Sequence, residues 1–357
     1  MPLSKKRNPL AEVLDGLTAE GAPELTEHLD GQALKCFACG HRCLIKEGKR
    51  GICKVRFNEG GHLRVPVNYV AALACDPTEK KPFFHALPGS DTLTFGMLGC
   101  DLHCAYCQNW LTSQALRDDA AGTQPQTVTP DRLVAMAKAY GASMIGSSYN
   151  EPLITAEWAV EVFKKARPAG FRTAFISNGN ATPQVLDYLR PWTDCYKIDL
   201  KSMSDKNYRQ LGGVVDNILD TVKMVHERGF WEEIVTLVIP GFNDSEDELK
   251  RAASFIASVS PDIPWHVTAF HQDYHMTENA NTTAEQLMRA CEIGRDEGLR
   301  YIYAGNLPGR VGRWENTYCP ACDELLVERY GYVIRQMRVT RPGKCPACSL
   351  SIPGIWN

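Results

Sequence analysis

The chain has 357 residues, of which 44% are hydrophobic and 23% charged, and its 39 Lys and Arg against 42 Asp and Glu give a net charge of −3. These fractions are typical of globular proteins and exclude a disordered, collagenous or coiled-coil chain, while the small net charge argues against a surface devoted to nucleic acid. No run approaches the roughly 18 apolar residues of a membrane helix, and the basic residues 1–8 lack the apolar stretch of a secretory signal behind them.

The predicted elements begin with residues 1–30, a polar segment expected to be a flexible lead, and continue with a cysteine- and turn-rich module over 31–90. From 91 to 308, short apolar runs alternate with amphipathic stretches, which predicts a mostly parallel sheet with right-handed helical crossovers. The remaining segment, 309–357, breaks the alternation and is predicted to form a second cysteine module. The predicted strands are 92–98, 143–148, 173–177, 195–199, 233–239, 265–269 and 301–304.

Helix signals lie between these strands. Ser245 with Glu248, and Thr283 with Gln286, have the spacing of capping boxes, in which each side chain hydrogen-bonds the other residue's backbone N–H. Gly298 follows the second of these helices and is predicted to stop it.

The fourteen cysteines are the unusual feature of the composition. Close thiolate spacing indicates metal or iron–sulfur ligation in a reducing compartment, so we expect a cytoplasmic, metal-binding protein rather than a disulfide framework. The isolated Cys75, Cys195 and Cys291 are expected to be ordinary buried side chains. The three groups are Cys36, Cys39, Cys43 and Cys53; Cys100, Cys104 and Cys107; and Cys319, Cys322, Cys345 and Cys348.

The central group has the spacing C-x3-C-x2-C and follows directly after the predicted strand 92–98. The carboxyl end of a strand is where the active sites of α/β barrels lie. A structural zinc site needs four ligands. Three thiolates therefore indicate either a cubane cluster with one open iron or a zinc ion that takes a fourth ligand such as His103. The position after a strand favours the cluster.

With Tyr106 before its last cysteine, this motif resembles that of the radical S-adenosylmethionine (SAM) superfamily. The resemblance implies an α/β fold, a partial (β/α)6 TIM-like barrel, and a 4Fe–4S cluster held by Cys100, Cys104 and Cys107. It also implies that the open iron chelates SAM and that the reduced cluster splits SAM into methionine and a 5′-deoxyadenosyl radical. The expected activity is hydrogen abstraction from a protein or small molecule, an oxidoreductase reaction whose chemistry the cofactors supply.

The resemblance extends to segments after four later strands and implies residues that contact SAM. Glu151 takes the place of a carboxylate that accepts hydrogen bonds from the SAM ammonium, and a strand-end carboxylate that caps the next helix is the alternative. Lys201 corresponds to a lysine that meets the SAM carboxylate, and His271 to a histidine at the ribose. The implied set is Tyr106, Asn150, Glu151, Ser177, Asn178, Asp199, Lys201 and His271.

The two flanking cysteine groups supply four thiolates each. Cys319, Cys322, Cys345 and Cys348 form two C-x2-C knuckles that resemble a rubredoxin or zinc ribbon, with a hairpin at 330–334. Zinc is favoured over iron there, because a structural ion lets a segment fold that is too small for its own core. The uneven spacing of the N-terminal group fits either zinc or an auxiliary Fe–S cluster of the 4Fe–4S type.

The cysteine frame, the segment 76–82, the Tyr-Asn-Glu-Pro sequence from Tyr149 and the terminal knuckles together resemble the AmmeMemoRadiSam family, which is similar to pyruvate formate-lyase activating enzymes. This resemblance implies a flavodoxin- or ferredoxin-type electron donor, a Memo-family protein partner and no membrane. The alternative is an RNA-binding or RNA-modifying protein that docks through basic zinc modules. Nucleic acid is not favoured, because no aromatic RNA-reading motif is present.

The segment 76–82 and His85 precede the first strand of the predicted barrel. They either reach over the barrel mouth and touch the substrate, through Lys81 and His85, or form an exposed charged loop.

Overall fold

The computed structural model describes residues 9–357, and its centre is an eight-stranded sheet in the order β16-β15-β14-β13-β12-β11-β9-β8. The seven strands from β9 to β16 are parallel, and β8 pairs antiparallel with β9. The seven predicted strands are confirmed, with ends that differ by two residues at most, and so is the mixed α/β class. The strands are β8 (Ala72–Pro77), β9 (Asp91–Gly96), β11 (Met144–Ser147), β12 (Arg172–Ser177), β13 (Cys195–Asp199), β14 (Trp231–Val238), β15 (Trp265–Ala269) and β16 (Ile302–Gly305).

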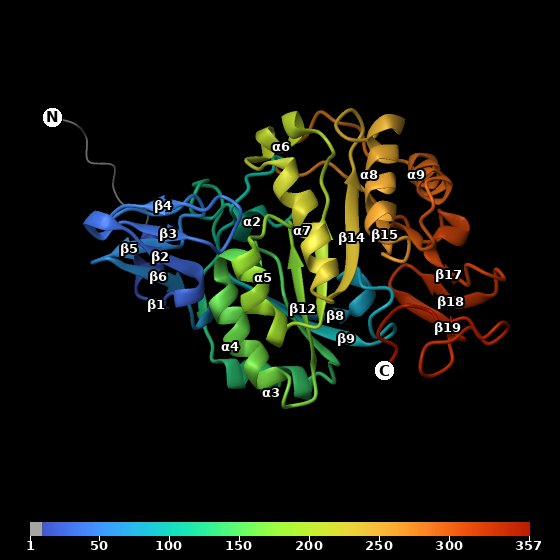
Figure 1. Cartoon of the computed structure of the whole chain (residues 1–357), viewed down its shortest axis with the longest axis horizontal. Helices are drawn as coiled ribbons and strands as arrows, with labels where there is room; N and C mark the ends of the chain where they lie inside the picture. The colour runs from blue at the N-terminus through green and yellow to red at the C-terminus, as the bar shows by residue number, and fades with distance from the viewer. Residues whose placement is uncertain (1–8) are drawn as a thin grey trace.

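Helices connect successive parallel strands, so the described chain contains six β/α units followed by β16. Figure 1 shows these helices along the outside of the curved sheet. No helix within residues 9–357 is both long and apolar enough to cross a bilayer. The helices are α2 (Trp110–Ser113), α3 (Pro130–Ala139), α4 (Ala156–Ala166), α5 (Pro183–Leu189), α6 (Asp205–Leu211), α7 (Val215–Glu227), α8 (Glu246–Val259) and α9 (Ala284–Asp296), with short 3-10 turns η1 (Pro23–Leu25), η2 (Asp30–Gln32), η3 (Thr78–Lys80), η4 (Pro152–Thr155), η5 (Arg190–Trp192) and η6 (Gly312–Glu315).

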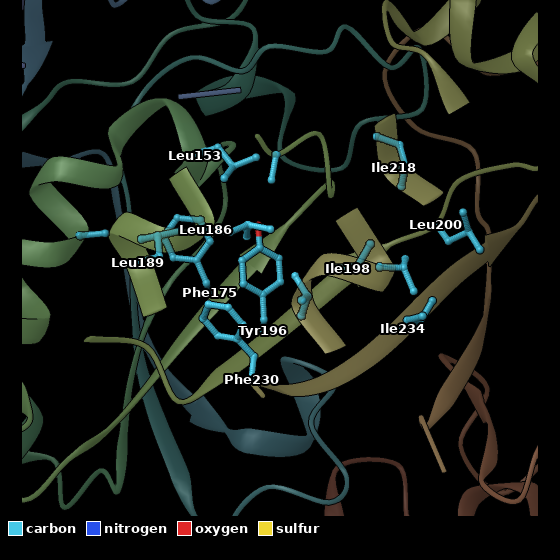
Figure 2. Packing of buried hydrophobic residues seen from close by; sticks show 14 of the residues in the cluster. Leu153, Phe175, Leu186, Leu189, Tyr196, Ile198, Leu200, Ile218, Phe230 and Ile234 are labelled. Carbon is cyan, nitrogen blue, oxygen red and sulfur yellow. The ribbon is translucent and has the colours of Figure 1, made fainter. Parts of the chain in front are cut away.

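The main core lies between the helices and the outer face of the sheet. Figure 2 shows Leu186 and Leu189 of α5 close to Phe175 of β12 and Tyr196 of β13, and all four side chains are fully buried. Burying one such side chain contributes about 1.5–3 kcal/mol to folding. The core therefore fixes the strands whose carboxyl ends carry the predicted site.

One of the two predicted capping boxes is complete. Thr283 and Gln286 hydrogen-bond each other's backbone at the start of α9. Ser245 caps α8 by accepting from the backbone N–H of Glu248, but the Glu248 carboxylate accepts from Ser202 Oγ and the backbone of Met203 instead. The Ser245–Glu248 box is therefore only half formed, because Ser202 and Met203 donate to the Glu248 carboxylate in place of the Ser245 backbone N–H.

The N-terminal module consists of two small antiparallel sheets, β2-β3-β4 and β1-β6-β5. Residues 1–8 of the expected flexible lead lie outside the described residues. Residues 9–30, however, form elements of this module, because β1 pairs with β6 and β2 pairs with β3. Its elements are α1 (Pro9–Asp15), β1 (Thr18–Glu20), β2 (Thr26–His28), β3 (Leu34–Cys36), β4 (Leu44–Ile45), β5 (Phe57–Glu59) and β6 (His62–Pro66).

The segment after β6 is paired with the barrel rather than with the module. β7 (Tyr69–Val70) pairs with β10 (Gln126–Thr127), and β8 extends the central sheet beside β9. These pairings differ from the expected start of the barrel at residue 91. The division of the chain into domains at 30/31, 90/91 and 308/309 stays a prediction.

The C-terminal module is a three-stranded antiparallel sheet on the opposite side of the barrel from the N-terminal module (Figure 1). Its strands are β17 (Thr317–Tyr318), β18 (Leu325–Tyr330) and β19 (Val333–Met337). The turn between β18 and β19 confirms the predicted hairpin, and Gly331 in that turn has a φ of 59°.

The segment between β8 and β9 packs near the amino ends of the barrel strands, where Phe83 clusters with Met144 and Cys195, and it meets the C-terminal module there. Backbone N–H groups of Phe84 and His85 donate to the Glu233 carboxylate of β14, each at 2.9 Å. Arg329 of β18 donates to the Phe84 carbonyl at 2.9 Å and lies over the Phe84 ring. We call this contact between the 78–90 segment and the C-terminal module the barrel floor.

His85 is fully buried in the barrel floor, where each ring nitrogen has one partner. Nδ1 donates to the carbonyl of Pro353 at 2.7 Å, and Nε2 accepts from the Tyr303 hydroxyl at 2.6 Å. Burial lowers the pKa of His85 to about 4. The sequence predicted that His85 either touches the substrate or lies in an exposed loop. Both predictions are wrong for this residue, because it is buried and does not line the cavity described below.

The stability of the protein is expected to fall as the pH falls from 6.5 to 5. The unfolded state takes up a proton near pH 6.5, whereas folded His85 stays neutral until about pH 4. Over these 1.5 pH units the free energy of unfolding should therefore drop by about 2 kcal/mol through this residue. Urea unfolding of wild type and His85→Gln at both pH values measures the difference. His62→Gln, which changes an exposed histidine, should keep the wild-type dependence; the same dependence in His85→Gln would contradict the expectation.

Candidate active site at the carboxyl edge of the sheet

A cavity of about 420 Å³ lies at the carboxyl ends of the parallel strands. The strand register creates it, because Ser147 at the end of β11 lies beside Phe95 of β9 and Phe175 of β12, so the following loops meet at one edge. His271 is exposed and does not line the cavity, although it hydrogen-bonds Gln108, which does. The predicted residues that line it are Cys100, Cys104, Tyr106, Cys107, Asn150, Glu151, Ser177, Asn178, Asp199 and Lys201.

The three central cysteines occupy residues 99–108, which we call the cluster loop. Cys100 Sγ accepts from the backbone N–H of Leu102 at 3.4 Å, and Cys107 Sγ lies 3.1 Å from Ser113 Oγ. Burial raises the pKa of Cys100 well above its usual range and that of Cys104 to about 12. These side chains are therefore thiols when free, and metal binding must release their protons.

The donors of the cluster loop fit a polynuclear cluster better than a single zinc ion. His103, the candidate fourth zinc ligand, is exposed, lies beside Gly212 and does not line the cavity. Within residues 9–357, no three potential ligand atoms of this loop lie within 4.8 Å of one another. A zinc ion with thiolates at about 2.3 Å would hold its sulfurs closer than that.

Glu151 connects two of the loops around the cavity. Its carboxylate accepts from Ser177 Oγ at 2.7 Å, from the backbone of Asn178 at 2.7 Å and from the backbone of Leu153 at 3.0 Å. The bond to Leu153 caps η4, which is the geometry of the capping alternative. Burial, with a contribution from nearby Asp101, raises the pKa of Glu151 to about 8. A cation in the cavity would lower that pKa and favour the charged form.

Tyr149 adopts a backbone conformation that usually requires glycine. Its φ is 70°, and its hydroxyl hydrogen-bonds Thr94 Oγ1 at 2.9 Å. The loop passes so close to Gly96 that a Cβ there would lie 2.5 Å from the Ser148 carbonyl oxygen. The side-chain anchor and the absent Cβ at Gly96 together hold the strained turn that brings Asn150 and Glu151 to the cavity.

Lys197 and Lys201 both contact Asp199 at the end of β13. The Lys201 ammonium is 3.4 Å from Asp199 Oδ2, and the Lys197 ammonium hydrogen-bonds Oδ1. Burial alone would raise the pKa of Asp199, but the two lysines hold it below its usual range. The triad therefore brings one net positive charge to the cavity wall, where an anionic group can bind.

Asp101, which we did not predict, is the buried centre of the loops around the cluster. Its carboxylate accepts from Asn178 Nδ2 at 2.7 Å and from Asn180 Nδ2 at 2.8 Å. Its backbone oxygen lies 3.1 Å from His41 Nε2 of the N-terminal module. The only sequence signal is its position between two cysteines of the motif, because its partners are about 60–80 residues away.

Two further side chains, His266 and Lys81, line the part of the cavity nearest the barrel floor. His266 Nε2 is 2.7 Å from the Glu233 carboxylate. Lys81 is buried, pairs with Asp76 at 2.8 Å and reaches the Tyr149 hydroxyl at 3.3 Å. Of the two residues expected to touch substrate, Lys81 thus reaches the cavity.

The C-terminal cysteines form a compact metal-ligand set. The sulfurs of Cys319, Cys322, Cys345 and Cys348 all lie within 4.8 Å of one another, which suits one tetrahedral ion. The identity of that metal stays a prediction.

Comparisons with known proteins identify related sequences. The Radical SAM superfamily model matches residues 95–256. An uncharacterized protein of Methanocaldococcus jannaschii is 36% identical over 306 residues, which are 85% of this chain and 90% of that protein. The pyruvate formate-lyase 1-activating enzyme of Escherichia coli K12 is 26% identical over 202 residues, 54% of this chain and 80% of that enzyme.

Among solved structures, a radical SAM methyltransferase from Sphaerobacter thermophilus aligns with a TM-score of 0.48 at 15% identity, over 87% of this chain and 81% of the other. A domain of pyruvate-formate lyase-activating enzyme from Bacteroides vulgatus aligns with a TM-score of 0.39 at 24% identity, over 44% of this chain and 94% of that domain.

Proposed function

Because the chain belongs to the radical SAM superfamily and is an enzyme of that class, we propose that it cleaves SAM at a 4Fe–4S cluster on Cys100, Cys104 and Cys107 and abstracts hydrogen from a protein or small-molecule substrate. The observation that carries this proposal is a loop with three thiols on the wall of a cavity, without a fourth ligand within residues 9–357 that would complete a single-ion site. When bound, the cluster supplies one electron to SAM, which breaks into methionine and a 5′-deoxyadenosyl radical.

The residues around the cavity have charges that suit SAM. Lys201 is the proposed partner of the SAM carboxylate, since the Lys197–Asp199–Lys201 triad carries a net positive charge. Glu151 is the proposed partner of the SAM ammonium, which would keep this buried carboxyl ionised. Tyr106, Asn150, Ser177 and Asn178 are proposed to complete the site, and His271 to act from the rim, next to Gln108.

The barrel floor supports the proposed radical chemistry by limiting access of water. Phe84 lines the cavity and is itself covered by Arg329. A side chain that closes the cavity in this way protects a reactive intermediate from solvent.

The N-terminal module offers a surface for the proposed electron donor. Near Cys43 and Cys53, exposed apolar Leu44 and Ile52 lie among exposed basic residues, which are Arg42, Lys46, Lys49 and Lys54. Such a surface complements an acidic one-electron carrier of the flavodoxin or ferredoxin type. We further propose membership of the AmmeMemoRadiSam family and a Memo-family protein partner, which rest on the sequence motifs alone.

The experiment that tests the proposal follows deuterium into 5′-deoxyadenosine. The anaerobically reduced enzyme is incubated with SAM and with either the protein fraction or the low-molecular-weight fraction of cells grown in D2O. Deuterium in 5′-deoxyadenosine is expected from one fraction, which also identifies the substrate class. Absence of any 5′-deoxyadenosine, or salt-dependent retention on RNA as the sole activity, would contradict the proposal.

Replacement of Lys81 by alanine is expected to uncouple SAM cleavage from hydrogen abstraction. Lys81 lines the cavity away from the cluster loop, and a lost charged hydrogen bond to the substrate costs about 1.5–3 kcal/mol. Deuterium transfer should therefore fall roughly 10–150-fold, while total 5′-deoxyadenosine changes little. Lys80→Ala is the comparison variant, because Lys80 pairs with the same Asp76 and also lines the cavity but is half exposed, so its loss should reduce deuterium transfer less than the loss of Lys81. Equal transfer in Lys81→Ala and wild type would exclude a substrate role for Lys81.

A further inference from the structure

The four N-terminal cysteines lie on segments that contact the cluster loop. Cys36 ends β3, Cys39 and Cys43 lie in the following turn, and Cys53 lies in the loop before β5. Cys36, Cys39 and Cys53 are buried, and Cys43 is partly exposed. The backbone N–H of Cys36 donates to the Cys43 carbonyl at 3.0 Å, and the backbone N–H of Ile52, next to Cys53, lies 3.5 Å from Cys43 Sγ. These contacts bring the segments with Cys36, Cys43 and Cys53 together, and Cys39 lies in the turn between Cys36 and Cys43.

The distances between the sulfurs distinguish this group from the C-terminal one. In the C-terminal group two sulfur pairs are 3.5 and 3.6 Å apart, close to the roughly 3.8 Å that a tetrahedral zinc ion with 2.3 Å bonds requires. In the described chain, no three sulfurs of the N-terminal group lie within 4.8 Å of one another, and the same is true of the cluster loop. Neither group therefore has the close spacing of a single tetrahedral ion that the C-terminal sulfurs show.

A buried arginine beside these cysteines has an unused donor. Arg56 is 1% exposed and forms a two-pronged ion pair with Glu157, at 2.7 and 2.8 Å. Its Nε–H has no hydrogen-bond partner within the described part of the chain. Arg56 lies beside the cysteine segments, because its carbonyl accepts from the backbone N–H of Gly51 at 2.9 Å and a Cβ on Gly51 would lie 3.6 Å from Cys43 Sγ. The inorganic sulfides of an iron–sulfur cluster accept such hydrogen bonds.

The N-terminal cysteines are attached directly to the cluster loop. A Cβ on Gly99 would lie 3.1 Å from the carbonyl oxygen of Cys53. Arg117 bridges the two segments by donating to the carbonyls of Leu102 and Ile52, at 2.9 and 2.8 Å.

The other side of this junction is formed by Asp101. The backbone N–H of Gly40 donates to the Asn180 carbonyl at 2.7 Å, and the Asn180 side chain donates to Asp101. Asp101 also contacts the turn after Cys39, because its backbone oxygen lies 3.1 Å from His41 Nε2. This buried residue therefore joins the turn that carries Cys39 to the cluster loop that carries Cys100.

We propose that Cys36, Cys39, Cys43 and Cys53 hold a second iron–sulfur cluster of the 4Fe–4S type, next to the proposed catalytic cluster and separated from it by Asp101. The C-terminal group then binds one metal ion rather than a cluster. The inference goes beyond the proposed function, on which it rests only for the first cluster.

Metal analysis of the anaerobically purified full-length protein tests the proposal without any variant. About eight iron atoms and eight sulfides, with one further ion in the C-terminal group, are expected per chain from two 4Fe–4S clusters. Reduced protein should show two electron paramagnetic resonance signals, of which SAM changes one. Two zinc ions with about four irons per chain, or a single signal that responds to SAM, would overturn the proposal.

Two variants then assign the iron. Cys36→Ala/Cys53→Ala should lose half of the iron and sulfide and keep the SAM-responsive signal, whereas the Cys100/Cys104/Cys107→Ala protein should lose the other half together with that signal. Unchanged iron in the first variant would overturn the second cluster. Failure of the proposed function is distinguishable, because then neither signal responds to SAM while the iron of the N-terminal group remains.

Discussion

Replacement of Cys100, Cys104 and Cys107 together by alanine is expected to abolish formation of 5′-deoxyadenosine from SAM. The three thiols are the loop's cluster ligands in the proposed function, and they line the cavity beside the Lys197–Asp199–Lys201 triad. Without them, SAM has no iron to chelate and no source for the electron that cleaves it. Quantification of 5′-deoxyadenosine after anaerobic reduction measures the effect, and the product should fall below detection.

Cys75→Ala is a suitable control for this result. Cys75 is also partly buried, but it lies on β8 and does not line the cavity. Its replacement should leave both iron content and SAM cleavage at the wild-type level. Turnover of SAM by the triple variant would show that these thiols are not the catalytic ligands.

Removal of the predicted C-terminal metal ligands, through Cys319→Ser with Cys345→Ser, is expected to unfold the C-terminal module and loosen the barrel floor. Structural zinc contributes about 10–16 kcal/mol to small zinc domains, as much as the roughly 5–15 kcal/mol that stabilises a whole domain. Arg329 would then lose its bonds to Phe84 and Thr317, at 2.9 and 2.7 Å. Charged hydrogen bonds contribute about 1.5–3 kcal/mol each, so the Tm of the barrel should fall by on the order of 10 °C.

Hydrogen exchange separates this effect from a general loss of stability. Amides of β17, β18 and β19 should exchange fast in the double variant, while those of β12 and β13 stay protected. Cys75→Ser serves as the control for the substitution itself. Slow exchange in β18 after the metal has been removed would show that the module folds without it.

The parallel sheet and the location of the site could be predicted because their signals are local. The predicted segments 195–199 and 265–269 coincide with β13 and β15, and a residue that disfavours strands, Asp194 or Pro264, precedes each of them. Parallel strands bring their carboxyl ends to one edge, so the loops with Cys100, Glu151 and Lys201 meet there.

The contacts that complete the site could not be predicted because they join distant segments. Asp101 is an ordinary acidic residue in the sequence, and only the fold supplies Asn178 and Asn180 as donors. His85 could not be placed for the same reason, since its partner Pro353 lies 268 residues away. Residues 9–30 have too little periodicity to predict strands, and their order comes from pairing with β3 and β6.

The barrel floor also has a consequence for biosynthesis. Residues 353–356 reach the ribosomal exit after every strand of the sheet, yet the backbone N–H of Ile355 bonds the His85 carbonyl at 2.7 Å. At about 5–20 residues per second, roughly 15–50 s separate the synthesis of His85 from that of Pro353. Until Pro353 emerges, the barrel floor of the nascent polypeptide is incomplete, and apolar side chains such as Phe84 are a target for chaperones.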